Sequence, residues 1–303
     1  KVRAGMHIML REGSAAKNLR DLLPLVTAKN AGRFLFVSDD RHPADLLGQG
    51  HIDFMIRTAV EQGLEPILAL QIASINAASY FGLSHLGAIA PGYRADMVIL
   101  DSLESLRVEK VIKNGSLVAE DGRLCVSLKP AEGAEGRRMN IAPLGPASLA
   151  IAAQPGPARV IGVVDGQIVT RSLSLEPRME EGLVVSDTGR DILKMAVLER
   201  HRGTGNIGRG LVQGFGLARG ALATSVAHDS HNIAVVGVSD ADMLAAVRAV
   251  QQMGGGLVAV AEGRAQARLP LPVAGLLSEA RLEEVQEGLE LHCRGKGDGM
   301  PAN

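Results

Sequence analysis

Two adjacent carboxylates, a guanidinium and an imidazole follow directly on a short apolar run. Residues 33–37 read RFLFV, and Ser38-Asp39-Asp40-Arg41-His42-Pro43 comes next. Carboxylates can ligate divalent metals and transfer protons. Adjacent strand residues point to opposite faces, so at most one aspartate faces the same side as a catalytic centre. The alternative is a turn that both carboxylates stabilise, because Asp-Asp after a strand is ordinary loop chemistry.

Two other polar clusters have the residue types for a site. Arg11-Glu12-Gly13-Ser14 predicts a loop that holds a polar substrate, or an ordinary loop with an ion pair. His228-Asp229-Ser230-His231-Asn232 offers metal ligands or proton carriers. The alternative there is a turn whose side chains bond its own backbone. No GxSxG elbow precedes Ser230, which argues against a serine hydrolase.

The Gly-rich segment 200–208, RHRGTGNIG, is cationic but matches neither phosphate-binding pattern. Its glycines are better explained by tight turns. Its Arg and His side chains remain candidates for lining a cleft together with residues from other loops.

The elements that must position the first cluster predict a fragment of an α/β fold. The apolar run 33–37 predicts a buried strand, and catalytic groups of α/β barrels lie at the C-terminal strand ends. Apolar spacing predicts helices over 19–26, 52–62 and 66–79, and another over the first ten residues. A barrel needs about 250 residues. Residues 1–83 are therefore expected to be the last βα units of a larger, metal-dependent TIM-like barrel that begins upstream.

The next segments predict a small β unit and a linker. Strands are expected over 95–101, 108–113 and 117–120, with Asn114-Gly115 as a hairpin turn. We assign 84–127 to a small β-sandwich unit. Residues 128–157 contain five prolines and are assigned to a linker.

Residues 158–303 predict a separate C-terminal α+β domain. Apolar runs predict strands over 159–164, 167–172, 192–199, 221–226, 233–238 and 257–261. A helix is expected after Ser239, an N-cap residue with Asp242 three positions later. The fold class is thus α/β plus α+β.

The composition of the chain argues against several classes of binding partner. The chain has 303 residues, a formal charge of −1 and 2% aromatic residues. These values give no reason to expect nucleic acid. No apolar run reaches the roughly 18 residues of a membrane span, so no membrane partner is expected. Cys125 and Cys293 form no zinc motif, and we expect a cytoplasmic protein. A homo-oligomer is expected from the frequency of symmetric assemblies.

Six segments of the chain resemble the C-terminal half of the bacterial adenine deaminase family, which belongs to the amidohydrolase superfamily. The segments are MHIMLREGSAAKNL (6–19), FLFVSDDRHPADLLGQGHID (34–53), GAIAPGYRADMVILD (87–101), VLERHRGTGNIGRGLVQGFGL (197–217), SVAHDSHNIAVVG (225–237) and LPLPVAGLLS (269–278). The 87–101 segment is widespread among amidohydrolases, whereas REGSAAKN, SDDRHP and AHDSHNI together are more specific.

The resemblance implies a binuclear manganese or iron enzyme of purine salvage and adenine catabolism. A metal-activated hydroxide would convert adenine to hypoxanthine and ammonia. By the motif match Asp39 is a metal ligand and the acid and base for the leaving amine, and Asp40 is a second catalytic residue. The implied substrate-binding residues are Arg11, Glu12, Ser14, Arg41, His42, His228 and His231.

The family's His-x-His has no counterpart in these 303 residues, which leaves Asp39 as the one expected metal ligand. The other ligands are expected from an N-terminal barrel half, in the same or a separate chain, and this chain is expected to be inactive alone. Two alternatives remain. One is another amidohydrolase that acts on cyclic amides. The long region 158–303 argues against it, because those relatives usually end near the β unit. The other is a non-catalytic subunit that completes a partner's site.

Overall fold

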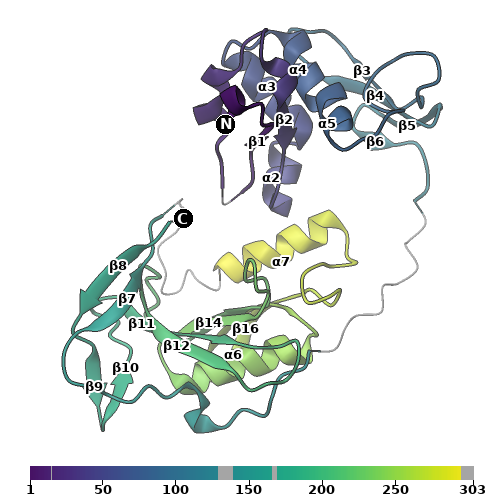
Figure 1. Ribbon diagram of the computed structural model, residues 1–303. Helices are drawn as coiled ribbons and strands as arrows, with labels where there is room; N and C mark the ends of the chain where they lie inside the picture. Colours follow the sequence, from purple (N-terminus) through teal and green to yellow (C-terminus); the bar gives the residue numbers. More distant parts are fainter. Residues whose placement is uncertain (15, 129–138, 166–168, 295–303) are drawn as a thin grey trace. The chain divides into compact units, whose positions relative to one another are not determined.

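A computed structural model describes residues 1–14, 16–128, 139–165 and 169–294 (Figure 1). The protein is a mixed α/β structure. Its contacts group into two compact units, Lys1–Ala131 and Glu132–Asn303, which are described one at a time. Within the described residues, no helix has both the length and the apolar character needed to cross a membrane.

The first unit contains two parallel strands, β1 (Ile8–Arg11) and β2 (Phe34–Val37). Ile8 lies opposite Phe34, and Arg11 lies opposite Val37. The first three residues of β2 are buried. The apolar run therefore forms the buried strand that the sequence predicts.

The prediction of a helix over the first ten residues is wrong. A single turn of 3-10 helix, η1 (Val2–Ala4), ends at Gly5, whose φ is 79°. Residues 8–11 then pair with β2. Their spacing suits a helix, but pairing with a buried strand satisfies their backbone groups in the interior.

Short helices pack around this strand pair. They are α1 (Leu19–Leu22), η2 (Leu23–Leu25), η3 (Ala31–Arg33), α2 (Pro43–Gly48), α3 (Ile52–Glu61), α4 (Pro66–Ala73) and α5 (Ile75–Tyr80). The helix expected over 66–79 is two helices, because Ser74 has non-helical backbone angles. Leu10, Leu19, Phe34, Met55 and Ile72 belong to one buried cluster and are 0% exposed.

Residues 97–124 form one four-stranded antiparallel sheet, in the order β3-β4-β5-β6. Its strands are β3 (Met97–Leu100), β4 (Val108–Lys113), β5 (Ser116–Glu120) and β6 (Arg123–Leu124). Asn114 and Gly115 have φ of 50° and 77°, as the predicted hairpin turn requires. The sequence predicted a small β-sandwich here, whereas the described residues form one sheet without a second sheet packed on it.

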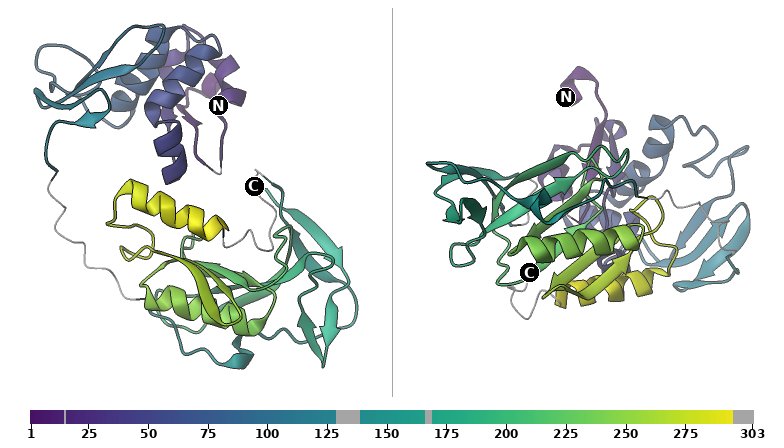
Figure 2. Two further views of the ribbon diagram at one scale, coloured as in Figure 1. Left: turned by 180° about the vertical axis from the view of Figure 1, so that it is seen from behind. Right: turned by 90° about the horizontal axis from the view of Figure 1, so that it is seen from below.

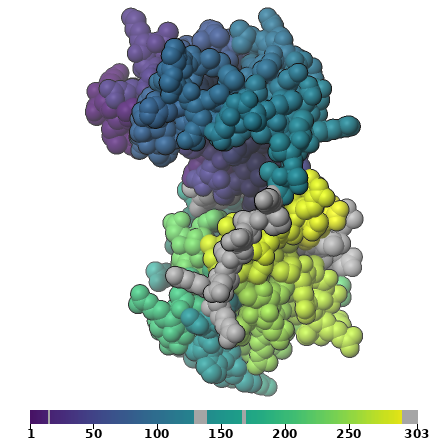
Figure 3. All heavy atoms as spheres, turned by 90° about the vertical axis from the view of Figure 1, so that its right-hand side faces the viewer, coloured from purple at the N-terminus to yellow at the C-terminus, as the bar shows by residue number. Residues whose placement is uncertain are grey.

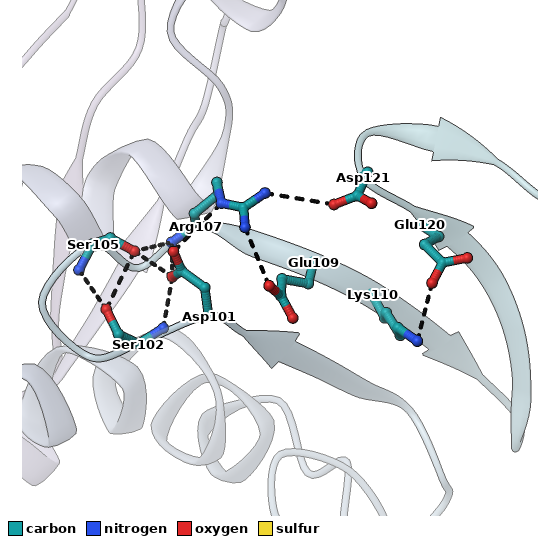
Figure 4. Close-up of polar contacts among 8 residues, drawn as sticks. All are labelled: Asp101, Ser102, Ser105, Arg107, Glu109, Lys110, Glu120 and Asp121. Carbon is teal, nitrogen blue, oxygen red and sulfur yellow. Dashed lines mark hydrogen bonds and ion pairs between the residues drawn. The ribbon is translucent and has the colours of Figure 1, made fainter.

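Polar contacts join the β3–β4 connection to the β5–β6 turn at one end of this sheet (Figure 4). Arg107 contacts Asp101, Glu109 and Asp121 at 3.4, 3.1 and 3.5 Å. The contact with Asp101 reaches back to the turn that precedes β4 (Figure 4). These contacts are confined to residues 101–121 and include none of the residues that follow β1 and β2.

The second unit contains an eight-stranded sheet in the order β16-β15-β13-β14-β11-β12-β7-β8. Neighbours run antiparallel except β12 and β7. The strands are β7 (Ala158–Gly162), β8 (Arg171–Leu175), β11 (Ile192–Leu198), β12 (Ile207–Gln213), β13 (Ala221–Thr224), β14 (Ile233–Gly237), β15 (Gly256–Ala261) and β16 (Arg264–Pro270). Residues 167 and 168 of the expected strand 167–172 lie outside the described residues, and β8 begins at Arg171.

Two helices lie on opposite faces of this sheet (Figure 2). Helix α6 (Asp240–Gln252) begins at Ser239, whose Oγ accepts a hydrogen bond from the Asp242 N–H at 3.2 Å, so the predicted N-cap is confirmed. Helix α7 (Leu282–Arg294) packs against β16 and lies on the surface of the unit (Figure 3). The main core lies between the sheet and α6.

The linker prediction needs correction over part of its length. Residues 129–138 lie outside the described residues. Farther along, Met139 and Leu149 are 9% and 1% exposed and pack in the core beneath α6. Apolar side chains buried in a core fix that stretch of chain, so residues 139–149 are part of the second unit rather than a spacer.

A hairpin of β9 (Arg178–Glu180) and β10 (Leu183–Val185) forms a separate two-stranded sheet in the second unit. It was not expected from the sequence, and neither were β12, β16 and α7. Strand β12 contains two glycines, and β16 alternates polar and apolar residues without an apolar run. The described part of residues 158–303 is otherwise a mixed sheet with helices, as an α+β domain requires.

Candidate active site

The two parallel strands end at the same edge of their sheet. The Glu12 N–H donates to the Val37 carbonyl at 3.1 Å, and the Ser14 N–H donates to the Asp40 carbonyl at 3.0 Å. The loop after β1 therefore runs beside the loop after β2. This pairing brings residues 11–14 and 38–42 together, as the catalytic edge of an α/β fold requires.

Asp39 and Arg11 form an ion pair at this edge. Asp39 Oδ2 lies 2.7 Å from Arg11 Nη1, and the two side chains are 47% and 32% exposed. The backbone of Arg11 is fixed by Asn18, whose Oδ1 accepts from the Arg11 N–H at 2.8 Å. Asp39 has a φ of 55°, a region that costs energy for a residue other than glycine. Arg11 thus fixes the direction of the Asp39 carboxylate, whose backbone is in the left-handed region.

Asp40 is placed differently from its neighbour. Its Oδ1 is buried and has no hydrogen-bond partner among the described residues. It lies under Gly13, where a Cβ would come within 2.2 Å of this oxygen. A side chain at position 13 would therefore require the Asp40 carboxylate to move. Both aspartates follow the end of β2 at Val37, and Asp39 has left-handed backbone angles, so the different environments of their side chains are set by the loop rather than by strand alternation.

Ser14 joins the two loops. Its Oγ donates to Asp45 Oδ2 and accepts from the His42 N–H at 2.7 Å. Asp45 lies in the first turn of α2. Sequence reasoning placed Ser14 against substrate and missed Asp45, although an acidic residue just after Pro43 is a common feature of a first helical turn.

Arg41 links the loop after β1 to α2 and the residue that follows it. It donates to the Glu12 carbonyl at 3.3 Å and to Gln49 Oε1 at 2.8 Å, and its guanidinium lies 5.0 Å from the centre of the Phe54 ring. Its Nε is buried and has no partner among the described residues. His42 is exposed and precedes α2.

Glu12 is 6% exposed, which is rare for a carboxylate. Burial raises the pKa of its carboxyl group above the usual range, while Lys17, Arg20 and Arg41 oppose that rise. A buried carboxylate next to a polar edge is a candidate for binding or proton transfer.

This edge does not make a metal site by itself. No three His, Cys, Asp or Glu side chains in the described part of the chain lie close enough to hold a metal ion together. Asp39 is one exposed carboxylate that is already paired with Arg11. The residues present therefore do not fit a binuclear centre without ligands from elsewhere.

A second polar cluster lies in the second unit, where the loop after β11 meets the turn between β13 and β14. Arg200, 6% exposed, donates from Nε to the His231 carbonyl and from Nη2 to the Ala274 carbonyl at 2.9 Å. Burial lowers the pKa of its guanidinium. His201 Nε2 lies 3.0 Å from the Ser230 carbonyl oxygen. The structure thus brings together two clusters that the sequence separates by about thirty residues.

The two histidines of that turn lie with ring centres 5.6 Å apart. His231 Nδ1 and Asn232 Oδ1 are buried and have no partner within the described residues. The structure records no ligand set around them. The assignment of His228 and His231 to substrate binding stays a prediction.

Comparison with known proteins covers both units. Residues 2–118 match the amidohydrolase family, and residues 167–293 match the adenine deaminase C-terminal domain. The chain is 50% identical over 292 residues to a protein named adenine deaminase from Desulfatibacillum aliphaticivorans, covering 96% of this chain and 51% of that protein. It is 49% identical over 301 residues to adenine deaminase 2 from Carboxydothermus hydrogenoformans, covering 99% and 53%.

The chain therefore spans about half the length of the curated relatives it matches. Among solved structures, the β-aspartyl dipeptidase of Fervidobacterium islandicum AW-1 is 21% identical over 42% of this chain and 36% of its own. Its TM-score of 0.33 is too low to support an argument about the fold.

Proposed function

Because this chain belongs to the amidohydrolase family and carries the C-terminal domain of adenine deaminases, we propose that the complete protein hydrolyses adenine to hypoxanthine and ammonia. The support is the identity of about half of all residues to proteins of that name. The observation that carries the proposal to a site is the Arg11–Asp39 ion pair at the shared edge of two parallel strands. A cytoplasmic homo-oligomer acting in purine salvage is part of the same proposal.

In this proposal β1 and β2 are the last strands of a TIM-like barrel. Their parallel pairing and the helices packed around them support it. The other strands would come from an N-terminal half, in the same or a separate chain.

Amidohydrolases generally use divalent metals, and we propose manganese or iron in a binuclear centre. Such a centre supplies the activated water when it is bound. Asp39 would contribute one ligand, and the remaining ligands would come from outside these 303 residues, because the described residues do not form a set of three.

The residues of this chain have distinct proposed roles. Asp39 would take the proton of the attacking water and return it to the departing amine. Arg11 would orient the Asp39 carboxylate through the 2.7 Å contact between Nη1 and Oδ2 rather than bind substrate. Glu12, Arg41 and His42 would line the polar edge.

Ser14 and Asp45 would keep the two loops in register through their hydrogen bond. Asp40, whose Oδ1 is buried next to Gly13, is proposed as a second catalytic residue that acts from the loop beside Asp39. His228 and His231 are proposed as further substrate contacts.

The test is ammonia release from adenine by the complete protein, with an N-terminal half that carries the His-x-His. We expect Asp39→Asn to lower kcat by 10²-fold or more, on the order of one acid–base group. Asp21→Asn, in α1, is the matched control and should retain activity. Activity on another cyclic amide but none on adenine would refute the substrate assignment.

One observation favours a second candidate, a non-catalytic subunit: the absence of a three-ligand cluster among the described residues. Metal analysis of the isolated chain separates the two. Two tightly bound metal ions per chain would exclude a subunit without its own centre.

A further inference from the structure

A cavity of about 340 Å³ lies in the second unit, and its lining includes no residue of the polar clusters described above. Its lining residues come from the β9–β10 hairpin, from Lys194 on β11, and from the segment that joins β14 to the start of α6. Sites for small molecules usually have volumes of about 300–1,000 Å³. The cavity is therefore large enough for one small ligand.

Lys194 supplies the most unusual group in this cavity. It lies on β11, a strand with neighbours on both sides, and the residue is 4% exposed. Lysine is almost never buried unless it is paired. Its Nζ lies 2.5 Å from Asp240 Oδ1, and both residues line the cavity. An ammonium has three donors and a carboxylate about four acceptor positions, so this pair has capacity for a ligand.

The base of the cavity is held by buried hydrogen bonds. Ser186 Oγ accepts from the Lys194 N–H at 2.9 Å and donates to the Gly237 carbonyl at 2.9 Å. These bonds tie the end of β10 to β11 and β14. The site is thus already formed, which lowers the cost of ordering it on binding.

The remaining walls are mainly apolar. Leu183, Val184, Val185 and Val238 line the cavity. Arg178 and Glu180, paired at 2.5 Å, also line it and are about half exposed. Two cations face two carboxylates, so the lining is formally neutral. A compact, neutral molecule with polar groups suits these walls better than an ion does.

We propose that this cavity binds a small neutral heterocycle whose edge carries a hydrogen-bond acceptor beside an N–H donor. Lys194 Nζ donates to the acceptor, and the Asp240 carboxylate accepts from the N–H. The purines of the proposed reaction have such an edge: C6=O beside N1–H in hypoxanthine, and N1 beside the amine in adenine. The choice of purines rests on the proposed function, whereas the edge itself follows from the Lys194–Asp240 pair. The cavity would then be an effector site for substrate or product.

Titration calorimetry of hypoxanthine and adenine into the 303-residue chain tests this proposal. We expect saturable binding that Lys194→Met and Asp240→Asn each weaken about tenfold or more, the cost of losing a hydrogen bond to a charged group. 1-Methylhypoxanthine, which lacks the N1–H, should bind as weakly as hypoxanthine binds to Asp240→Asn. Lys110→Met, at an exposed lysine in the first unit, should leave binding unchanged.

Two controls keep the outcome decisive. Circular dichroism shows whether each variant is folded, and hydrogen exchange of residues 183–186 and 238–240 in the unchanged chain should slow on adding hypoxanthine. No saturable binding, or binding that Lys194→Met does not weaken, would overturn the proposal and leave a structural ion pair. Loss of binding in Asp39→Asn instead would place the purine at the first unit's strand edge. Because no turnover is measured, failure here does not bear on the deaminase assignment.

Discussion

Replacing Gly13 by alanine tests the close approach between the two strand-end loops. The new Cβ would lie 2.2 Å from Asp40 Oδ1, 3.1 Å from the Ala16 carbonyl oxygen and 3.3 Å from the Ser38 carbonyl oxygen. The carbonyl contacts need shifts of a few tenths of an ångström. The carboxylate must move by about 1 Å within a buried site, an overpacking that costs about 1–3 kcal/mol. We expect Gly13→Ala to lower the free energy of unfolding of the first unit by that amount.

A double-mutant cycle attributes this cost to Asp40. Asp40→Ala removes the obstacle, and it also removes an oxygen that has no partner among the described residues. In that background Gly13→Ala should cost at least about 1 kcal/mol less, a coupling typical of residues in contact. Gly32→Ala is the matched control, because its Cβ would meet nothing within 4 Å. That change should be neutral or stabilise by up to about 1 kcal/mol.

The assay is urea unfolding followed by circular dichroism, since the chain has no tryptophan. Hydrogen exchange of the β1 and β2 amides assigns the change to the first unit. If the complete protein has the proposed deaminase activity, Gly13→Ala should also lower its kcat, because the change displaces the loop that carries Asp39. An equal cost of Gly13→Ala with and without Asp40 would refute the steric reasoning.

Three more outcomes are expected. Backbone and side-chain donors of Thr204 and the preceding residues lower the pKa of Glu199 from the usual 4.5 to about 2. The stabilisation of the native chain over Glu199→Gln should therefore be constant above about pH 5 and shrink as the pH falls toward 2, in urea unfolding at each pH. Ile233→Ala, at a 0% exposed core position, should cost about 2–5 kcal/mol, whereas Leu277→Ala, at 63% exposure, should stay within about 0.5 kcal/mol in the same assay. Arg107→Ala should cost no more than about 1 kcal/mol despite three carboxylate contacts, because its side chain is 59% exposed; a larger loss of thermal stability would contradict this.

Local patterns in the sequence were enough for several elements. The apolar run before Ser38 predicted the buried strand β2, and Asn114-Gly115 predicted the hairpin turn. Ser239 predicted the start of α6. Each depends on neighbours within a few residues, which a single sequence displays directly.

The errors have a common cause. Residues 8–11 have helical spacing but pair with a strand that begins 26 positions later, and Leu149 lies in a proline-rich stretch but is buried under α6. Tertiary contacts override local preference in both places. The assignment of Arg11 and Ser14 to substrate binding stays a prediction, and the structure adds their side-chain contacts with Asp39 and Asp45.

The sequence alone therefore determined which groups are available: the paired aspartates after an apolar strand, the Arg-Glu-Gly-Ser loop and the histidine turn. The tertiary structure decided which of them meet. Parallel pairing of β1 and β2 joins Arg11 to Asp39 and seats Asp40 under Gly13, and sheet formation in the second unit joins Lys194 to Asp240. These contacts link residues 27 to 46 positions apart, and no local periodicity encodes such pairs, because they form only when strands distant in the chain take neighbouring places in one sheet.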